Sequence, residues 1–117
     1  MIIHDYKSSG GKCLVLDYIQ SLSKPEMIDG LSVLKSMEDD KLDELNIKRW
    51  QGKIWEVYFY KHNRIFYIAI DGKEIYLLHA CRKQKNKTEK KDKNIVINRA
   101  KELSKELGKT EHTKTTV

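Results

Sequence analysis

Positively charged side chains are crowded into one short segment of this 117-residue sequence. Residues 82–93 contain seven cations, which are Arg82, Lys83, Lys85, Lys87, Lys90, Lys91 and Lys93. Residues 1–52 carry 7 Lys and Arg against 9 Asp and Glu, whereas residues 53–117 carry 16 against 8, which accounts for the net charge of +6. A basic half of this kind favours binding to a polyanion such as nucleic acid. A lysine-rich segment that is merely solvated is the alternative.

Metal, disulfide and nucleotide chemistry have little support in the sequence. Cys13 and Cys81 are the only cysteines, too few for a disulfide framework or a four-ligand zinc site. His4, His62 and His112 do not lie near them at the spacing of a metal site. No Gly-rich phosphate loop or dinucleotide fingerprint is present. We therefore expect no bound metal and no cofactor.

The apolar segments of the chain are short. None approaches the roughly 20 residues that a membrane-spanning helix requires. The first residues lack the charged and apolar regions of a secretory signal. We therefore expect a cytoplasmic protein with no membrane partner.

Hydrophobic spacing predicts the elements that would position the basic segment. Residues 2–6 predict an edge strand, and residues 14–22 have apolar side chains at helical spacing. A second helix begins at residues 23–26, where Ser-Lys-Pro-Glu is typical of a capping box. Residues 39–52 predict a connecting loop. The buried stripe of the second helix is expected to consist of Met27, Leu31, Leu34 and Met37.

Alternating apolar residues follow from residue 53 onward. Three strands are predicted over residues 53–60, 64–70 and 74–81, joined by tight turns as an antiparallel meander. Residues 82–91 are expected to be an exposed loop. A last helix should begin near Asp92 and stop at Gly108. On the first strand of the meander, alternation places Trp55, Val57 and Phe59 on one face and Glu56, Tyr58 and Tyr60 on the other.

These elements predict one α+β domain over residues 1–108, followed by a disordered tail over residues 109–117. The sheet is expected to be antiparallel, made of the N-terminal strand and the meander. Two N-terminal helices and one C-terminal helix should pack against it.

Three segments resemble a known family. Residues 11–22 resemble its Gly-then-helix opening. Residues 54–57 (Ile-Trp-Glu-Val) and 64–67 (Arg-Ile-Phe-Tyr) are similar to two of its strands, and residues 77–88 to its Leu-Leu-His strand, basic loop and Lys-Thr ending. In this order and spacing, the sequence resembles the HigB-type branch of the RelE/ParE toxin superfamily, also described as phage-derived toxin-like proteins.

The resemblance implies a RelE-like fold and the toxin of a type II toxin-antitoxin system. Such toxins are metal-independent endoribonucleases that cut mRNA, often on the ribosome, and a co-encoded helix-turn-helix antitoxin of the HigA kind neutralises them. The implied partners are therefore mRNA, the ribosome and that antitoxin. In this chemistry the ribose 2′-OH attacks the adjacent phosphate, so the site needs a base, a cation and an acid.

Four residues are candidates for those catalytic roles. Arg64 matches the family's Arg and would grip the phosphate; the alternative is an arginine paired with Glu74 or simply solvated. Glu56 would accept a proton or position an arginine, or else form a cross-strand salt bridge. Tyr58 stands where the family usually has Arg, and would donate a proton or stack on a base; a half-buried tyrosine with its hydroxyl in water explains it equally well. Lys83 would stabilise phosphate charge.

The remaining cations of the basic segment are candidates for binding the RNA backbone. They are Arg82, Lys85, Lys87, Lys90 and Lys91. His79 is interpreted as a structural, hydrogen-bonded histidine, because it shares strand parity with Ile75, Leu77 and Cys81.

Two other functions stay open. One is a ParE-like protein that poisons a topoisomerase without nuclease chemistry. The other is a phage-derived binding module that has lost catalysis, which Tyr58 in place of arginine would explain.

Overall fold

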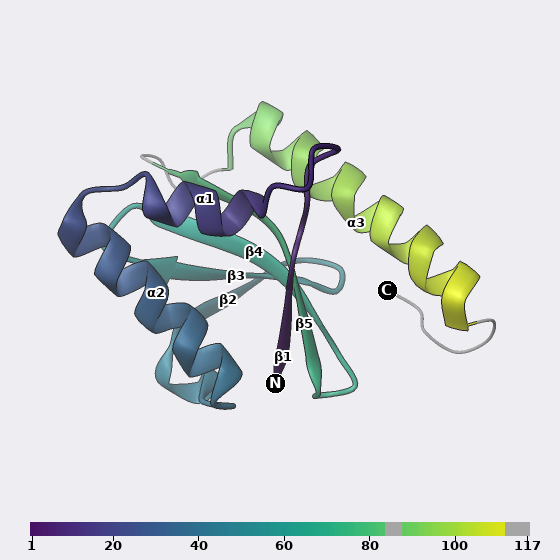
Figure 1. The fold of residues 1–117 in the computed structure, drawn as a ribbon, viewed down its shortest axis with the longest axis horizontal. Coiled ribbons are helices and arrows are strands. Elements are labelled where there is room, and N and C mark those ends of the chain that lie inside the picture. Colours follow the sequence, from purple (N-terminus) through teal and green to yellow (C-terminus); the bar gives the residue numbers. More distant parts are fainter. Residues whose placement is uncertain (84–87, 112–117) are drawn as a thin grey trace.

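The computed structural model describes residues 1–83 and 88–111 of the chain (Figure 1). Along these residues the elements are β1 (Ile2–Asp5), α1 (Leu14–Gln20), α2 (Lys24–Glu38), the 3-10 helix η1 (Leu42–Glu44), β2 (Asn46–Gln51), β3 (Ile54–Phe59), β4 (Asn63–Ile70), β5 (Glu74–Arg82) and α3 (Lys90–Glu111).

The described strands form one mixed sheet in the order β1-β5-β4-β3-β2. β1 runs parallel to β5, pairing Ile3 with Ile75, whereas the other neighbours are antiparallel. The predicted α+β class is confirmed, but the prediction of a purely antiparallel sheet is wrong. Tight turns force only β2 to β5 to alternate in direction; β1 connects to β2 through α1 and α2, and this long helical connection leaves β1 free to join the opposite edge of the sheet beside β5 in the same direction.

The prediction of a connecting loop over residues 39–52 is also wrong, because this segment contains η1 and β2. β2 pairs antiparallel with β3 through a turn at Gly52, whose φ of 56° suits a residue without a Cβ. The strand signal is weak because Ile47 and Trp50 are only half-buried, and the register is irregular between Arg49 and Gln51.

Helices cover both faces of the sheet, giving three layers (Figure 1). α1 and α2 pack on one face around a core that includes Val15, Ile19, Val33, Met37, Val57, Phe59, Ile65 and Leu77. α3 packs on the other face around a smaller core of Ile54, Phe66, Ile68, Leu78, Cys81 and Val96. The predicted arrangement of two N-terminal helices and one C-terminal helix against the sheet is confirmed.

The second helix begins where the sequence predicts, but its contacts differ. The Ser23 hydroxyl donates to the Glu26 carboxylate at 2.7 Å, and no side-chain bond caps a backbone N–H at Ser23. Leu31 is 39% exposed, so its expected place in the buried stripe is wrong. Met37 is fully buried as expected, and Met27 and Leu34 are partly buried against the same core. Gly30 and Val33 complete the buried side, because Gly30 lets α2 approach Ile19 and Phe59.

The predicted alternation is confirmed for residues 55–59 of β3, whereas Tyr60 lies in the turn after the strand with a φ of 40°. The alternation on β5 is interrupted. A register shift in the β4–β5 pair matches Phe66 with His79 and Tyr67 with Leu77. The irregularity brings His79 onto the α3 side of the sheet, where it stacks on Phe66, whereas Leu77 lies in the opposite core. The expectation that His79 shares a face with Leu77 is therefore wrong.

The last helix is longer than predicted. α3 begins at Lys90 and continues through Gly108 to Glu111, so the predicted stop at Gly108 is wrong; a helix tolerates one exposed glycine at a cost of about 1 kcal/mol. Lys83, expected in an exposed loop, is buried. Among the described residues, no helix has both the length and the apolarity needed to span a bilayer.

Candidate functional site

Four predicted catalytic side chains meet on the α3 side of the sheet. The Tyr58 hydroxyl donates to Glu56 Oε1 at 2.7 Å, and Lys83 Nζ lies 3.9 Å from the same oxygen. The Arg64 guanidinium carbon lies 3.7 Å from the centre of the Tyr58 ring, a close cation–π contact. We call Glu56, Tyr58, Arg64 and Lys83 the Glu56 cluster.

Strand geometry explains why these residues converge. Glu56 and Tyr58 are two residues apart on β3 and therefore share a face, opposite Val57 and Phe59. Tyr58 is paired with Arg64 on β4, which places their side chains next to each other. Lys83 follows directly after β5, and its backbone N–H donates to the His62 carbonyl at 2.7 Å, which holds the end of the strand beside the β3–β4 turn.

The Glu56 cluster is a group of buried charges. Exposed fractions are 1% for Glu56, 6% for Lys83 and 9% for Arg64. Among the described residues, Glu56 Oε2 and Arg64 Nε have no hydrogen-bond partner. One carboxylate lies with two cations, so the cluster has unused hydrogen-bonding capacity and excess positive charge, which a bound anion would satisfy.

The contacts distinguish between the interpretations of these residues. Arg64 is neither solvated nor paired with Glu74, which instead lies 2.9 Å from His4. Glu56 does form a salt bridge, although its partner is Lys83 and the separation is long. The Tyr58 hydroxyl is hydrogen-bonded to a carboxylate rather than left to water.

The pKa shifts indicate which proton each group can move. Burial and the hydrogen bond to Glu56 raise the pKa of Tyr58 above its ordinary value, so the phenol keeps its proton at neutral pH and is a weaker acid than a free tyrosine. Burial lowers the pKa of Lys83, Glu56 opposes that shift, and Arg64 adds to it. Lys83 therefore gives up its proton more easily than a surface lysine.

A groove of about 310 Å³ opens beside the cluster. Glu56 and Lys83 form part of its wall, and the other lining residues are Lys48, Arg49, Trp50, Gln51, Thr88 and Lys93. The Trp50 indole N–H donates to Thr88 Oγ1 at 3.0 Å, which ties β2 to the segment before α3. The groove thus combines cations with an aromatic ring, the surface that single-stranded nucleic acid prefers.

The predicted RNA-binding cations fall into three groups. Lys85 and Lys87 lie outside the described residues. Lys90 and Lys91 are exposed in the first turn of α3. Arg82 points to the opposite face of the sheet, where its Nη2 lies 2.6 Å from Glu26 on α2. The structure therefore does not bring Arg82 together with the Glu56 cluster.

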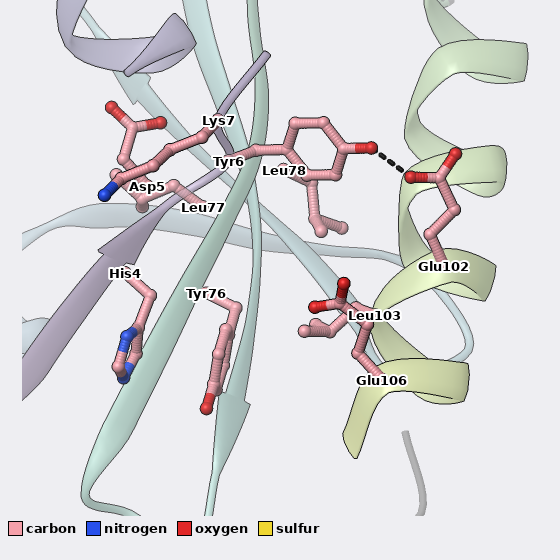
Figure 2. A pocket seen from close by; sticks show the side chains of 10 residues that line it. All are labelled: His4, Asp5, Tyr6, Lys7, Tyr76, Leu77, Leu78, Glu102, Leu103 and Glu106. Atoms are coloured by element: carbon pink, nitrogen blue, oxygen red, sulfur yellow. Dashed lines mark hydrogen bonds between the residues drawn. The ribbon is translucent and has the colours of Figure 1, made fainter. Parts of the chain in front are cut away.

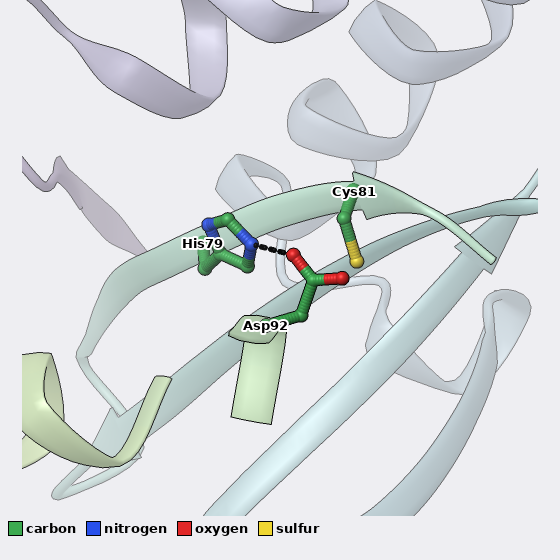
Figure 3. A group of neighbouring side chains, drawn as sticks. All are labelled: His79, Cys81 and Asp92. Atoms are coloured by element: carbon green, nitrogen blue, oxygen red, sulfur yellow. Dashed lines mark hydrogen bonds and ion pairs between the residues drawn. The ribbon is translucent and has the colours of Figure 1, made fainter. Parts of the chain in front are cut away.

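His79, Cys81 and Asp92 form a second polar group next to the cluster (Figure 3). His79 Nε2 donates to Asp92 Oδ1 at 2.8 Å, so the interpretation of His79 as hydrogen-bonded is confirmed. Arg99 Nη1 donates to the Leu78 carbonyl at 2.8 Å and lies 3.4 Å from His79 Nδ1. Burial lowers the pKa of His79, which keeps its imidazole neutral at physiological pH.

A separate cavity of about 330 Å³ lies where β1 and β5 face α3 (Figure 2). Its walls include the stacked rings of His4 and Tyr76, and the Tyr6 hydroxyl is hydrogen-bonded to Glu102. Glu102 and Glu106 project toward it from α3 (Figure 2). With carboxylates on one wall and none of the Glu56 cluster among its lining residues, this cavity is a poor site for a phosphate chain.

Sequence reasoning missed the residues that β2 and α3 add to the groove. Lys48 and Trp50 fell in a segment predicted to be a loop, and Lys93 was only one member of a charged run. The turn residue Gly52 was the available signal, because a strand ending at Gln51 would place Lys48 and Trp50 next to the predicted strand of Glu56.

Comparison with known families gives a match over most of the chain. The model of a family described as phage derived protein Gp49-like (DUF891) matches residues 17–101. This range contains the whole Glu56 cluster and the first half of α3. No curated protein gives a significant match.

Proposed function

Because the chain belongs to the phage-derived Gp49-like family, part of the RelE/ParE toxin-like group, we propose that it is a RelE/HigB-like toxin that cuts mRNA without a metal. The observation that carries this proposal is the Glu56 cluster. A carboxylate, a phenol and two cations meet within hydrogen-bonding or ion-pair reach beside a basic groove. These are the groups that phosphodiester cleavage by an internal 2′-hydroxyl requires.

Glu56 is the proposed base. Its carboxylate takes the proton of the ribose 2′-OH, whose oxygen attacks the adjacent phosphorus. The bond to the 5′-oxygen breaks, and Tyr58, protonated at neutral pH, supplies the proton for that leaving oxygen. The products are a 2′,3′-cyclic phosphate and a 5′-hydroxyl, so no water and no metal enters the reaction.

Lys83 and Arg64 supply the positive charge. Lys83 lines the groove and can reach a phosphate oxygen, whereas Arg64 lies deeper, stacked on Tyr58. As the phosphorane forms, it gains negative charge, and two cations in a water-poor site stabilise that charge more than they stabilise the substrate.

The groove is the proposed path of the RNA strand. Lys48 and Lys93 line it together with Glu56 and Lys83 and would contact phosphates, and Trp50 offers a ring on which a base can stack. We further propose that the substrate is mRNA on the ribosome, in the cytoplasm, and that a helix-turn-helix antitoxin covers this groove. The family membership and the net charge of +6 support these partners.

The experiment compares cleavage by the wild type and by Glu56→Gln and Lys83→Met in a translation extract, with Lys73→Ala as the matched control. Lys73 is an exposed lysine in the β4–β5 turn, away from the groove. We expect the cluster variants to cut at least about 100-fold more slowly, and the control to cut normally. Because the proposed chemistry uses no metal, any cleavage of a naked RNA oligonucleotide by the free protein should have the same rate in Mg²⁺ and in EDTA.

Three results would contradict the proposal. Full cleavage by both cluster variants would remove the assigned site. Growth arrest accompanied by DNA damage, while mRNA stays intact, would indicate a topoisomerase poison instead. Antitoxin binding with neither mRNA cleavage nor DNA damage would indicate a module that has lost catalysis.

A further inference from the structure

We propose that His79, Cys81 and Asp92 form a zinc-binding site that joins the start of α3 to β5. One donor atom from each residue lies within 4.8 Å of the other two: an imidazole nitrogen, the thiol sulfur and a carboxylate oxygen. Figure 3 shows the three side chains directed toward one another from the strand and the helix. This site is distinct from the Glu56 cluster, and its function does not depend on the proposed nuclease.

The donor set selects the metal. Sulfur and imidazole nitrogen are ligands of zinc and related transition metals, whereas magnesium and calcium prefer oxygen. Three protein ligands leave a fourth tetrahedral position for water or a small anion. Zinc is therefore the physiological ion that these residues fit best.

The geometry is close to that of a bound site. Ligands at about 2.0–2.3 Å from zinc lie roughly 3.5 Å from each other in a tetrahedron. Donor atoms separated by as much as 4.8 Å would therefore have to move about 1 Å closer together. His79 Nε2 and Asp92 Oδ1 are 2.8 Å apart and would have to move slightly apart. Both changes are side-chain movements, and the backbone elements already stand opposite each other.

Burial shields a bound ion from solvent, but it also makes the Cys81 thiol harder to deprotonate. The side chains of His79 and Asp92 are 14% and 11% exposed, so a bound ion would be shielded from most of the solvent. Burial raises the pKa of the Cys81 thiol to about 12. Zinc must therefore displace the thiol proton as the Zn–S bond forms, which releases one proton per ion bound.

Neighbouring charges set an upper limit on affinity. In the metal-free protein His79 Nε2 carries the proton that it donates in the hydrogen bond to Asp92. Zinc would bind this nitrogen, so the proton would have to move to Nδ1. The Arg99 guanidinium, 3.4 Å from Nδ1, opposes this tautomer and must move away. We therefore expect weaker binding than at a four-cysteine structural site, and tighter binding after Arg99→Gln.

The test is a titration of the reduced, EDTA-treated, tag-free full chain with Co²⁺ and then Zn²⁺. We expect one equivalent to bind with a thiolate-to-cobalt charge-transfer band, and Zn²⁺ to displace the Co²⁺. Saturating Zn²⁺ should raise the melting temperature by about 5 °C or more, whereas Mg²⁺ should not. Cys13→Ser is the matched control, because Cys13 is the other cysteine and lies at the start of α1.

Variants of the two cysteines and of Asp92 decide whether the zinc site exists. Loss of the band in Cys81→Ser and its retention in Cys13→Ser support the site, as does at least a tenfold weaker binding in Asp92→Asn. Absence of the band from the wild type, or its retention in Cys81→Ser, overturns the proposal. If Cys81→Ser does not fold, X-ray absorption of the wild-type zinc protein decides: one sulfur in the first shell supports the site, and a shell of nitrogen and oxygen alone overturns it.

Discussion

Glu56 is the residue on which the charge balance of the buried site depends. Its Oε1 atom is shared by the Tyr58 hydroxyl and the Lys83 ammonium, and it is the single carboxylate of the Glu56 cluster. Removing one partner of a buried ion pair leaves the other charge uncompensated, which costs more than the pair itself contributes. We therefore expect substitutions in the Glu56 cluster to change the stability of the fold as well as the rate of cleavage.

We predict that Glu56→Gln lowers the free energy of unfolding by about 3 kcal/mol. The amide oxygen can still accept from Tyr58, but it no longer compensates Lys83 and Arg64. Lys83→Met should cost less, because Glu56 keeps Tyr58 and lies near Arg64. Urea unfolding measures both variants, and the double variant Glu56→Gln/Lys83→Met should recover part of the loss; equal losses for both single variants would contradict this account.

The residues of the site were predictable to different extents. Glu56 and Tyr58 follow from strand alternation, and the resemblance to the toxin family singles out Arg64. The burial of Lys83 was not predictable, because a lysine beside other lysines is ordinarily solvated and its ion pair with Glu56 depends on how β5 ends. The trio of His79, Cys81 and Asp92 was missed because it requires the contact between β5 and α3.

At the scale of elements, the docking of α2 depends on a glycine. A Cβ added at Gly30 would lie 2.9 Å from Ile19 Cγ2 and 2.9 Å from Phe59 Cε2, both in the buried core. A larger residue fits only if α2 moves away from the sheet or the buried side chains of Ile19 and Phe59 are displaced.

We predict that Gly30→Ala lowers the free energy of unfolding by about 2 kcal/mol, despite the better helix propensity of alanine. Gly108→Ala is the matched control, since it is also a helical glycine but has open space around it. That control should leave stability unchanged or raise it by less than about 1 kcal/mol. Thermal unfolding of both variants gives the comparison, and equal effects would argue against close packing at Gly30.

Glu26 links α2 to the sheet through polar contacts. Its carboxylate accepts from Asn63 Nδ2 at 2.9 Å and from Ser23 Oγ at 2.7 Å, and pairs with Arg82 at 2.6 Å. The hydrogen bond from Asn63 is the largest cause that lowers the pKa of Glu26 below its ordinary 4.5, followed by that from Ser23.

This shift predicts a pH dependence. Because the folded-state pKa lies below that of the unfolded chain, the stabilisation is fully present above about pH 4.5 and is lost as the pH falls through the folded-state value. Wild type should therefore lose more of its free energy of unfolding between about pH 6 and pH 3 than Glu26→Gln does. Parallel pH profiles for the two proteins would show that Glu26 is not the linked group.

Most elements were predictable, whereas two features were not. Strong helical or alternating periods locate α1, α2 and β3 to β5. β2 lacks such a period, because it is an edge strand with charged residues and an irregular register. The break in alternation at His79 is a property of strand pairing with β4, and single-strand reasoning assumes an unbroken pleat.

At the scale of the whole molecule, cations are distributed between two faces with different roles. Lys48, Lys83 and Lys93 line the groove on the α3 side. Arg82 lies on the opposite face and is bound to Glu26. Net charge alone does not distinguish these groups, whereas their position on the sheet does.

We predict that RNA binding by the wild type weakens steeply with salt, and that Lys48→Ala/Lys93→Ala reduces the slope of log K against log salt concentration by about 0.7 per lysine. Arg82→Gln should lower stability without changing that slope, and Lys73→Ala should change neither. Fluorescence anisotropy with a single-stranded RNA oligonucleotide measures the slopes. A reduced slope for Arg82→Gln would place the RNA on the other face.

The parallel pairing of β1 with β5 has a consequence for biosynthesis. β1 has no strand to join until residues 74–77 have been made, and the Glu56 cluster lacks Lys83 until later still. A nascent chain therefore carries an unfinished sheet and an incomplete set of charges while most of it is emerging. Under the proposed function, the ribosome that translates this message is spared until the nascent chain extends past Lys83.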